Sequence, residues 1–308
     1  MDDKELLDLY RHCTLCPRRC GADRTQEGRS GICGVGCIPA VNLSMLHHGE
    51  EPVLSGSRGC GAVFFEGCSL GCIFCQNYGI SHGHVKASHE MSVDRLADLF
   101  VSLQEQGAHN IDLVTPMHFA PSIAKALELA RANGLSIPVI VNTGGYDLPE
   151  TLKILDGLVD IYMPDLKFFS SSLSLETCHA ADYFERAGEA LDEMYRQTGP
   201  VVLGEDGLLL RGMVIRHLML PGKLFDTKKV LDYIAEHFGT NVYISLMSQY
   251  TPMPSLPGSA PSYLKKTISA DYYEAAVRHL ELILPDLDRV FIQDRGSIGD
   301  EMIPDFRS

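Results

Sequence analysis

The chain has 308 residues, a formal net charge of -14 and an apolar content of 45%. That length and apolar content predict a globular protein, built as one large α/β barrel or as two ordinary domains. Proteins that bind nucleic acid usually carry a basic surface against the phosphates, so the acidic balance argues against that class. No stretch of about 18 uncharged apolar residues and no signal peptide are present, which predicts a cytoplasmic protein without a membrane span.

Residues 1–56 form the first predicted unit, a small Cys-rich module. Five cysteines lie in "CTLCPRRCGADRTQEGRSGICGVGC", a stretch that is rich in Gly and Arg and shows little helical periodicity. Such a segment lacks the apolar residues for a core of its own, so a bound metal is expected to hold it together. In a cytoplasmic protein, clustered cysteines indicate metal or redox chemistry more often than disulfides.

Cys13, Cys16, Cys20 and Cys33 are the expected ligands of this metal, with Cys37 as a competing fourth ligand. "CTLC" supplies one C-x2-C knuckle, "CPRRC" adds Cys20, and Cys33 follows at the longer separation of a ligand brought back by a loop. Four thiolates favour a closed tetrahedral zinc site, and a second [4Fe-4S] cluster is the close alternative. Unliganded thiols in a covering loop are the third interpretation.

Residues 57–255 show strand and helix patterns in alternation. Six apolar or β-branched runs, separated by helical stretches, are "AVFFE", "NIDLVT", "PVIVNT", "VDIYMPD", "MVIRHLML" and "NVYISLM". Repeated strand–helix units are typical of a parallel sheet. Six units predict an α/β fold of the partial (β/α)6 TIM-like barrel type, and a doubly wound open sheet is the alternative architecture.

Helix-end signals support this division. Ser92 is expected to cap a helix over residues 93–106, and Gly107 and Gly134 follow the ends of two predicted helices. The last unit, residues 256–308, contains a predicted helix at "SADYYEAAVRHLELIL" and a late strand at "RVFIQD". This extension is expected to pack on the barrel.

Three further cysteines, Cys68, Cys72 and Cys75, lie in "GCSLGCIFCQN", directly after the run "AVFFE". In a β/α barrel, functional residues gather where a strand ends and its loop begins. Thiolates in C-x3-C-x2-C spacing can each bind one iron of a [4Fe-4S] cluster and leave the fourth iron open to a substrate. A zinc site completed by His82 or His84 is the alternative, although structural zinc sites usually present paired knuckles.

This cysteine spacing resembles that of the radical S-adenosylmethionine (SAM) superfamily. In that superfamily the open iron chelates the amino and carboxylate groups of SAM, and an electron breaks a C–S bond to yield a 5'-deoxyadenosyl radical. Further segments resemble the branch related to pyruvate formate-lyase activating enzyme, and the resemblance covers nearly the whole chain. They include "HHGEEPVLSGSRGCGAVFFEGCSLGCIFCQNYGIS", "QGAHNIDLVTP", "VNTGGYDLPETL", "VDIYMPDLKFF", "RHLMLPG" and "SLMSQYTP".

The resemblance implies which residues meet the nucleoside and the amino group of SAM. Phe74 takes the aromatic position beside the adenine, and Asn77 takes the position near the ribose. Thr115 stands where the activating enzymes have a Gly-Gly-Glu stretch beside the amino group, and the chain departs from the pattern there. Asn142 and Thr143 align with an Asp-Thr-Asn-Gly stretch, with Asn142 at the acidic position.

The resemblance also implies a catalytic pair, Asp165 and Lys167, in "MPDLK". The Lys167 ammonium is expected to offset the SAM carboxylate, because a compact cation suits that charge. A solvent-exposed pair is the alternative. Arg216 and Gln249 end the fifth and sixth predicted strands and are expected to face the cleft as cofactor-binding residues.

Two histidines, His118 and His217, are candidate proton donors, with a plain structural role as the favoured interpretation. Three functions fit the sequence. The first is hydrogen abstraction from a backbone glycine that activates a glycyl-radical enzyme, with a flavodoxin or ferredoxin-like electron donor. The second is radical modification of a small molecule or peptide. The third is a non-catalytic iron–sulfur or zinc protein that regulates a partner, which predicts no SAM cleavage.

Overall fold

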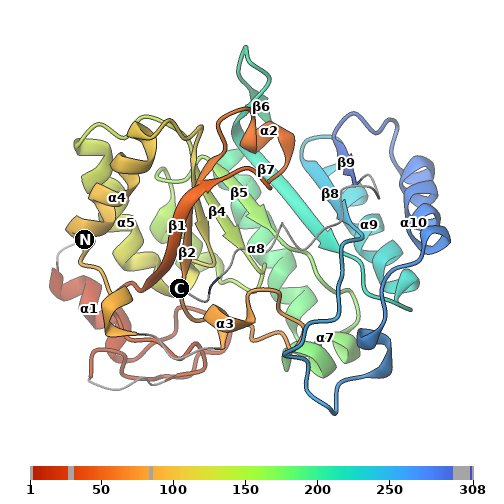
Figure 1. Cartoon of the computed structure of the whole chain (residues 1–308), viewed down its shortest axis with the longest axis horizontal. Helices are drawn as coiled ribbons and strands as arrows, with labels where there is room; N and C mark the ends of the chain where they lie inside the picture. Colours follow the sequence, from red (N-terminus) through yellow and green to blue (C-terminus); the bar gives the residue numbers. More distant parts are fainter. Residues whose placement is uncertain (1–2, 27–30, 83–85, 294–305, 307–308) are drawn as a thin grey trace.

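The computed structural model describes residues 3–26, 31–82, 86–293 and 306 and shows a mixed α/β fold (Figure 1). Its strands are β1 (Val41–His47), β2 (Cys60–Phe65), β3 (Ile111–Val114), β4 (Val139–Thr143), β5 (Ile161–Pro164), β6 (Val202–Leu203), β7 (Leu209–Leu218), β8 (Tyr243–Met247) and β9 (Val290–Ile292). Its α-helices are α1 (Asp3–Arg11), α2 (Pro52–Ser55), α3 (Tyr78–Ser81), α4 (Val93–Glu105), α5 (Ala120–Ala132), α6 (Pro149–Leu152), α7 (Ser171–Cys178), α8 (Tyr183–Thr198), α9 (Leu224–Phe238) and α10 (Ala270–Ile283).

The strands form one mostly parallel sheet in the order β1-β2-β3-β4-β5-β7-β8-β9, with β6 paired to β7 outside this path. The six strands predicted from the sequence are all present as β2, β3, β4, β5, β7 and β8, and neighbours among them are parallel. Their order follows the chain without the reversal that defines a doubly wound sheet, so that alternative is wrong. The sheet is not closed, because its path ends at β1 and β9.

The first 56 residues contain more regular structure than the sequence predicted. α1 precedes the cysteines, and β1 pairs antiparallel with β2, with His47 opposite Cys60. The β1 strand was not predicted although "VNLSM" alternates apolar and polar residues, because the whole segment was interpreted as a loop-rich module; Val41 alone among its residues is buried. β1 therefore adds part of the predicted Cys-rich module to the edge of the central sheet.

The Cys-rich segment shares its packing with the helices that follow it in the chain. The hydroxyl groups of Tyr10 and Ser122 lie 2.9 Å apart, within hydrogen-bond distance. Arg24 is only 2% exposed, and its Nη1 donates to the carbonyl oxygen of His118 at 2.7 Å. The guanidinium carbon of Arg24 also lies 4.8 Å from the ring centre of Tyr10 and 5.5 Å from that of Phe119. These contacts anchor the segment on α5 and on the turn before it.

Apolar side chains cover both faces of the sheet. On the outer face, α4 packs on β2 and β3, and α8 packs on β5 and β7. On the inner face, a buried cluster that includes Ile140, Ile161, Val214 and Tyr243 forms an apolar floor. Side chains two residues apart share a face of a strand, so Asn142 lies above Ile140 on the same face of β4. The polar groups at the carboxyl ends of the strands therefore lie next to a buried apolar layer.

The predicted helix ends are confirmed. The Ser92 hydroxyl oxygen accepts from the backbone N–H of Arg95 in the first turn of α4. Gly107 and Gly134 follow the ends of α4 and α5 with φ values of +99° and +101°, a region that favours glycine. The helix and strand predicted near the C-terminus are present as α10 and β9.

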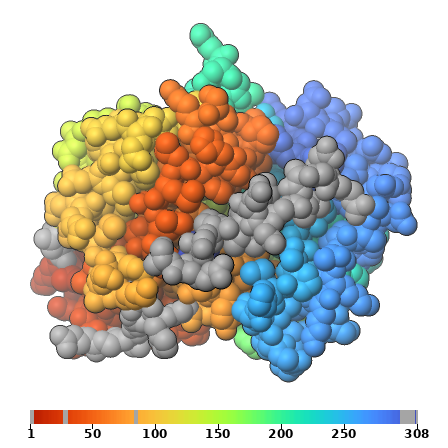
Figure 2. Space-filling model, viewed as in Figure 1, coloured from red at the N-terminus to blue at the C-terminus, as the bar shows by residue number. Residues whose placement is uncertain are grey.

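A hairpin made by β6 and the start of β7 was not predicted. It projects from the molecule (Figures 1 and 2) and leaves Val202 and Leu203 exposed. None of the helices in the described part of the chain is long and apolar enough to cross a bilayer. The cellular location stays a prediction.

Candidate active site

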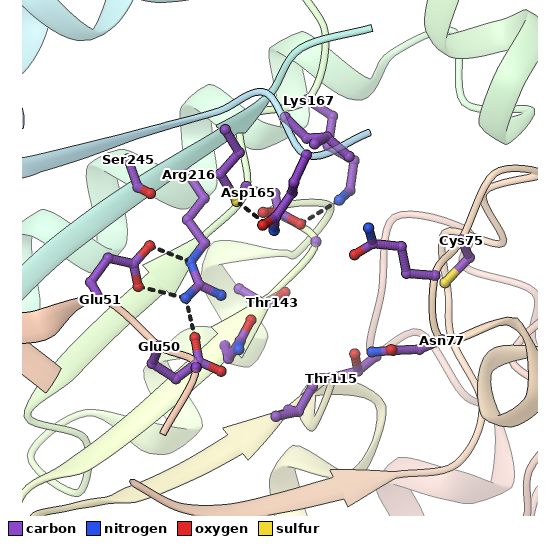
Figure 3. A pocket seen from close by; sticks show the side chains of 18 of the residues that line it. Glu50, Glu51, Cys75, Asn77, Thr115, Thr143, Asp165, Lys167, Arg216 and Ser245 are labelled. Atoms are coloured by element: carbon purple, nitrogen blue, oxygen red, sulfur yellow. Dashed lines mark hydrogen bonds and ion pairs between the residues drawn. The ribbon is translucent and has the colours of Figure 1, made fainter. Parts of the chain in front are cut away.

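A cavity of about 520 Å³ lies at the carboxyl ends of the parallel strands (Figure 3). Every residue that the sequence assigned to the first cluster and to SAM lines it. These residues are Cys68, Cys72, Phe74, Cys75, Asn77, Thr115, Asn142, Thr143, Asp165, Lys167, Arg216 and Gln249. Parallel strands direct their following loops to one edge of the sheet, which is why positions far apart in the sequence meet there.

Three thiols lie together on the loop after β2. The backbone N–H of Leu70 points to Cys68 Sγ at 3.4 Å, and the Ser81 hydroxyl points to Cys75 Sγ at 3.3 Å. Burial, and then the neighbouring Cys72 and Cys75, raise the pKa of Cys68 to about 12. Three thiols on one short loop, with donors directed at two of them, suit three irons of a [4Fe-4S] cluster by donor chemistry.

Cys178, at the end of α7, is a fourth thiol beside this loop. Its Sγ lies 3.1 Å from the Sγ of Cys72, and both side chains are buried. The backbone N–H of Ile73 donates to the carbonyl oxygen of Thr177 at 3.0 Å, which joins α7 to the cysteine loop. The sequence did not single out Cys178, because it stands alone and 106 positions from Cys72.

The zinc alternative at this loop gains no support from His82. The ring Nδ1 of His82 lies 2.8 Å from the Ser81 hydroxyl, and the ring stacks on Tyr78 with centres 4.4 Å apart. His82 is absent from the cavity lining. The other candidate, His84, lies outside the described residues. As they stand, no three His, Cys, Asp or Glu side chains in residues 3–26, 31–82, 86–293 and 306 are placed to hold a metal ion.

His118 and His217 have structural positions outside the cavity lining, as the favoured interpretation held. The Nε2–H of His118 donates to the carbonyl oxygen of Glu66 at 2.8 Å, and burial lowers its pKa to about 3. The Nδ1–H of His217 donates to the carbonyl oxygen of Leu166 at 2.7 Å, and its Nε2 accepts from the Thr227 hydroxyl at 3.0 Å. Both rings are buried and satisfied, so neither is a proton donor to the cavity.

Asp165 and Lys167 form an ion pair on the loop after β5. Their side chains are only 23% and 17% exposed, so this is not the solvent-exposed pair that was the alternative. Burial lowers the pKa of Lys167, but Asp165 and then Cys72 raise it, and it stays well above its usual range. Tyr183 fixes the backbone here: its hydroxyl accepts from the N–H of Lys167 at 3.0 Å and bonds the carbonyl oxygen of Gly144 at 2.9 Å. The ammonium is therefore held charged at the cavity wall.

Thr115 has a backbone conformation that is rare for its residue type. Its φ is +58°, and its N–H donates to the carbonyl oxygen of Asn142 at 2.8 Å. A β-branched residue in the left-handed region costs about 1–3 kcal/mol and persists only where the surroundings determine it. This strained backbone borders the cavity at the position where the sequence departs from the Gly-Gly-Glu pattern.

Phe74 and Gln249 are held by neighbours on the cavity wall. The Phe74 ring makes edge contacts with Phe168 and Tyr250, with ring centres 6.1 and 6.2 Å apart. The Gln249 side-chain oxygen accepts from the Gln293 side-chain amide at 2.7 Å. Packing therefore fixes the orientation of both side chains.

Arg216, on β7, is paired with two carboxylates that the sequence did not assign to the site. Its Nε donates to Glu51 at 2.9 Å and its Nη2 donates to Glu51 at 2.5 Å, while Nη2 also pairs with Glu50. These side chains lie on the opposite side of the cavity from Cys75 (Figure 3). The adjacent acidic residues in "HHGEEP", within a segment that carries the family resemblance, were the available signal.

The four cysteines predicted to bind a second metal lie near one another. Cys13 and Cys33 are buried, Cys16 is half-buried and Cys20 is exposed. Burial raises the pKa of Cys16 to about 12, with further contributions from Cys33, Cys13 and Cys20. The neighbours that shift the pKa of Cys37 are Arg24, Glu90 and Asp23 instead, after burial. Cys16 therefore has Cys13, Cys20 and Cys33 as neighbours, and the choice between Cys33 and Cys37 as fourth ligand stays a prediction.

Fold and site together define a mixed α/β protein whose cavity is lined by three thiols and by a half-buried Lys–Asp pair. The sequence of residues 62–234, more than half of the chain, matches the model of the Radical SAM superfamily, and the chain belongs to that superfamily. Membership implies an enzyme that uses a [4Fe-4S] cluster and SAM for radical chemistry. The branch within the superfamily stays a prediction.

One relative in sequence is the "Uncharacterized protein MJ0674" of Methanocaldococcus jannaschii. It is 28% identical over 255 residues, which cover 80% of this chain and 68% of the relative. Among solved structures, Streptococcus suis SuiB bound to precursor peptide SuiA has a TM-score of 0.47 at 14% identity, over 74% of this chain and 47% of that chain. The catalytic domain of the hyperthermophilic chitinase from Pyrococcus furiosus has a TM-score of 0.38 at 11% identity, over 65% of this chain and 70% of that chain. Neither structural likeness is strong enough to carry an argument about function.

Proposed function

We propose that this chain is a radical SAM enzyme that reductively cleaves SAM in order to abstract a hydrogen atom from its substrate. One observation carries the proposal: Cys68, Cys72 and Cys75 share a single cavity with the half-buried Asp165–Lys167 pair. When bound, the [4Fe-4S] cluster supplies the electron that breaks the C–S bond of SAM. We also propose that the open sheet is the partial barrel of this superfamily.

Lys167 and Asp165 hold the charged end of SAM in this proposal. The Lys167 ammonium offsets the SAM carboxylate, and Asp165 orients the ammonium from its other side. Tyr183 keeps the backbone of both residues in place through its hydroxyl group. The apolar floor below excludes water, which strengthens each of these charged contacts.

The remaining cofactor-binding residues meet the nucleoside and the amino group. Phe74 presents its ring beside the adenine, and the Asn77 side-chain amide lies near the ribose. Thr115 offers carbonyl and hydroxyl oxygens to the SAM amino group, and Asn142 and Thr143 line the cavity beside it, where the Thr143 hydroxyl donates to Asp147. The strained backbone at Thr115 supports this role, because such strain is concentrated at sites where function requires it.

The family resemblance supports activation of a glycyl-radical enzyme as the reaction, with a flavodoxin or ferredoxin-like protein as the electron donor. Radical modification of a small molecule or peptide is the second candidate. The charged wall formed by Arg216, Glu50 and Glu51 favours this second candidate, because it places specific recognition groups inside the cavity. A non-catalytic regulatory protein predicts no SAM cleavage.

We further propose that Cys13, Cys16, Cys20 and Cys33 bind a second metal. Zinc is the preferred metal, and a second [4Fe-4S] cluster is the alternative. The shifts in the pKa of Cys16 support this, because they arise in part from the other three thiols. Arg24 adds support: its Nη1 lies 3.5 Å from Cys13 Sγ in a buried position, where it offsets the charge of a thiolate.

Anaerobic reconstitution tests the proposed reaction. With about four irons per chain, the reduced protein is expected to show an electron-spin signal that changes on addition of SAM, and to form 5'-deoxyadenosine. Cys72→Ala should abolish the product, because one of three protein anchors is lost. Cys60→Ala is the matched control, since Cys60 is buried in the apolar floor outside the cavity lining. A signal that ignores SAM contradicts the proposal, and a glycine-centred radical on an added glycyl-radical enzyme distinguishes the first candidate from the second.

A further inference from the structure

One wall of the cavity carries more negative than positive charge. Glu50 and Glu51 share the single guanidinium of Arg216, and the three side chains are only 9%, 7% and 14% exposed. An ion pair that served only to fasten the segment before α2 to β7 needs one carboxylate for one guanidinium. Here a second carboxylate is held in the same poorly solvated place, where an unbalanced charge is costly.

A third carboxyl group lies beneath this wall. Asp112, on β3, is fully buried, and its carboxyl oxygens have no hydrogen-bond partner of ordinary geometry among the described residues, although the Asn142 side chain lies close enough to lower its pKa. Asp112 and Val114 share one face of β3, and Val114 lines the cavity, so the Asp112 carboxyl group faces the cavity interior one step deeper. Burial, and then Glu50, raise the pKa of Asp112 well above its usual range, although Arg216 offsets this in part.

We propose that Glu50, Glu51, Asp112 and Arg216 form a subsite for a cationic group, an ammonium or amidinium, of the enzyme's substrate. The inference rests on the proposed function, which requires a substrate in this cavity. A bound cation balances the second carboxylate, and its N–H groups supply the donors that the buried Asp112 oxygens lack. Glu50 Oε1 is 3.8 Å from His47 Nε2, an ion pair only when the His47 ring is protonated and too long for a hydrogen bond, so beside a neutral His47 this oxygen can accept from the ligand.

The position of the subsite suits a substrate anchor. Figure 3 shows Glu50, Glu51 and Arg216 on one side of the cavity and Cys75 and Asn77 on the other. A cationic group held at the first side leaves the rest of the molecule to extend toward the region assigned to SAM. A substrate carboxylate fits less well, because the Nε and Nη2 groups of Arg216 already donate to carboxylates and the surrounding charge repels an anion.

Titration calorimetry on the anaerobically reconstituted, SAM-bound protein tests the subsite. The probes are n-butylamine, which is an ammonium ion at pH 7, and butyrate, which has a similar carbon chain and the opposite charge. Butylammonium is expected to bind and butyrate is not. Glu50→Gln should weaken butylammonium binding at least tenfold, whereas Glu105→Gln, on the exposed end of α4, should leave it unchanged. Asp112→Asn should also weaken it, and thermal unfolding of each variant shows whether it is folded.

The outcomes separate the subsite from the proposed reaction. The subsite is overturned if butyrate binds as tightly as butylammonium, or if a folded Glu50→Gln protein binds butylammonium unchanged. In either case, SAM binding and cleavage would still support the proposed reaction. Displacement of butylammonium by an equal concentration of K⁺ also overturns it, in favour of an inorganic cation site. If SAM does not bind, while butylammonium binds to the unmodified protein and does not bind to Glu50→Gln, the result contradicts the proposed reaction. The proposed subsite is then still supported.

Discussion

Replacing Lys167 by Met tests the assignment of the SAM carboxylate contact. The substitution removes the ammonium and keeps a long apolar side chain, so the wall of the cavity stays filled. In the protein, Lys167 is paired with Asp165 and borders the cavity with only 17% of its side chain exposed. The variant therefore loses one charged contact to SAM and leaves the Asp165 carboxylate without its partner.

The expected size of the effect follows from this burial. A hydrogen bond to a charged group contributes about 1.5–3 kcal/mol when it is largely removed from water. At about 1.4 kcal/mol per factor of ten, the dissociation constant of SAM should rise roughly 10- to 150-fold in Lys167→Met. The upper half of that range is expected, because the unpaired Asp165 carboxylate then repels the carboxylate of SAM.

Isothermal titration of SAM into anaerobically reconstituted protein measures the change. Lys229→Met is the matched control, because Lys229 also pairs with an aspartate, Asp232, but lies 41% exposed on α9. The double variant with Asp165→Asn should bind SAM no more weakly than Lys167→Met alone, since Asp165 acts through the lysine. A SAM affinity within twofold of the unmodified protein in Lys167→Met refutes the assignment.

Three further predictions concern other sites. The Cys178→Ala variant should keep about four irons per chain, because Cys178 contacts the sulfur of Cys72 and does not replace it as a ligand. If this variant loses as much iron as Cys72→Ala does, the prediction is wrong. Joint replacement of Cys13 and Cys16 should remove about one zinc per chain, whereas loss of about four of eight irons indicates a second cluster and unchanged metal content refutes a second site. The folded protein holds His118 neutral with a pKa of about 3 against 6.5 when unfolded, so the unfolded chain binds the proton first as pH falls. The free energy of unfolding, measured in urea, should therefore fall below pH 6.5 by up to about 1.4 kcal/mol per pH unit from this group, and His118→Gln should remove that slope.

The sequence by itself predicted the strands and the cysteine loop. Period and composition over five to eight residues are local properties, so the six parallel strands could be located before any contact was known. The position of Cys68 directly after a buried strand placed the thiols at the carboxyl edge of the sheet. The β1 strand was missed although "VNLSM" alternates apolar and polar residues, because it lies in the segment that was interpreted as a loop-rich module.

The tertiary structure alone decided which unassigned groups pair with the residues of the cavity. Glu50 and Glu51 pair with Arg216 across 166 and 165 positions, and Cys178 meets Cys72 across 106. No local pattern encodes such pairs, because they depend on how each strand and helix is placed against the others. A buried charged side chain has to be paired with groups that the fold places next to it, and the sequence alone cannot show which groups those are.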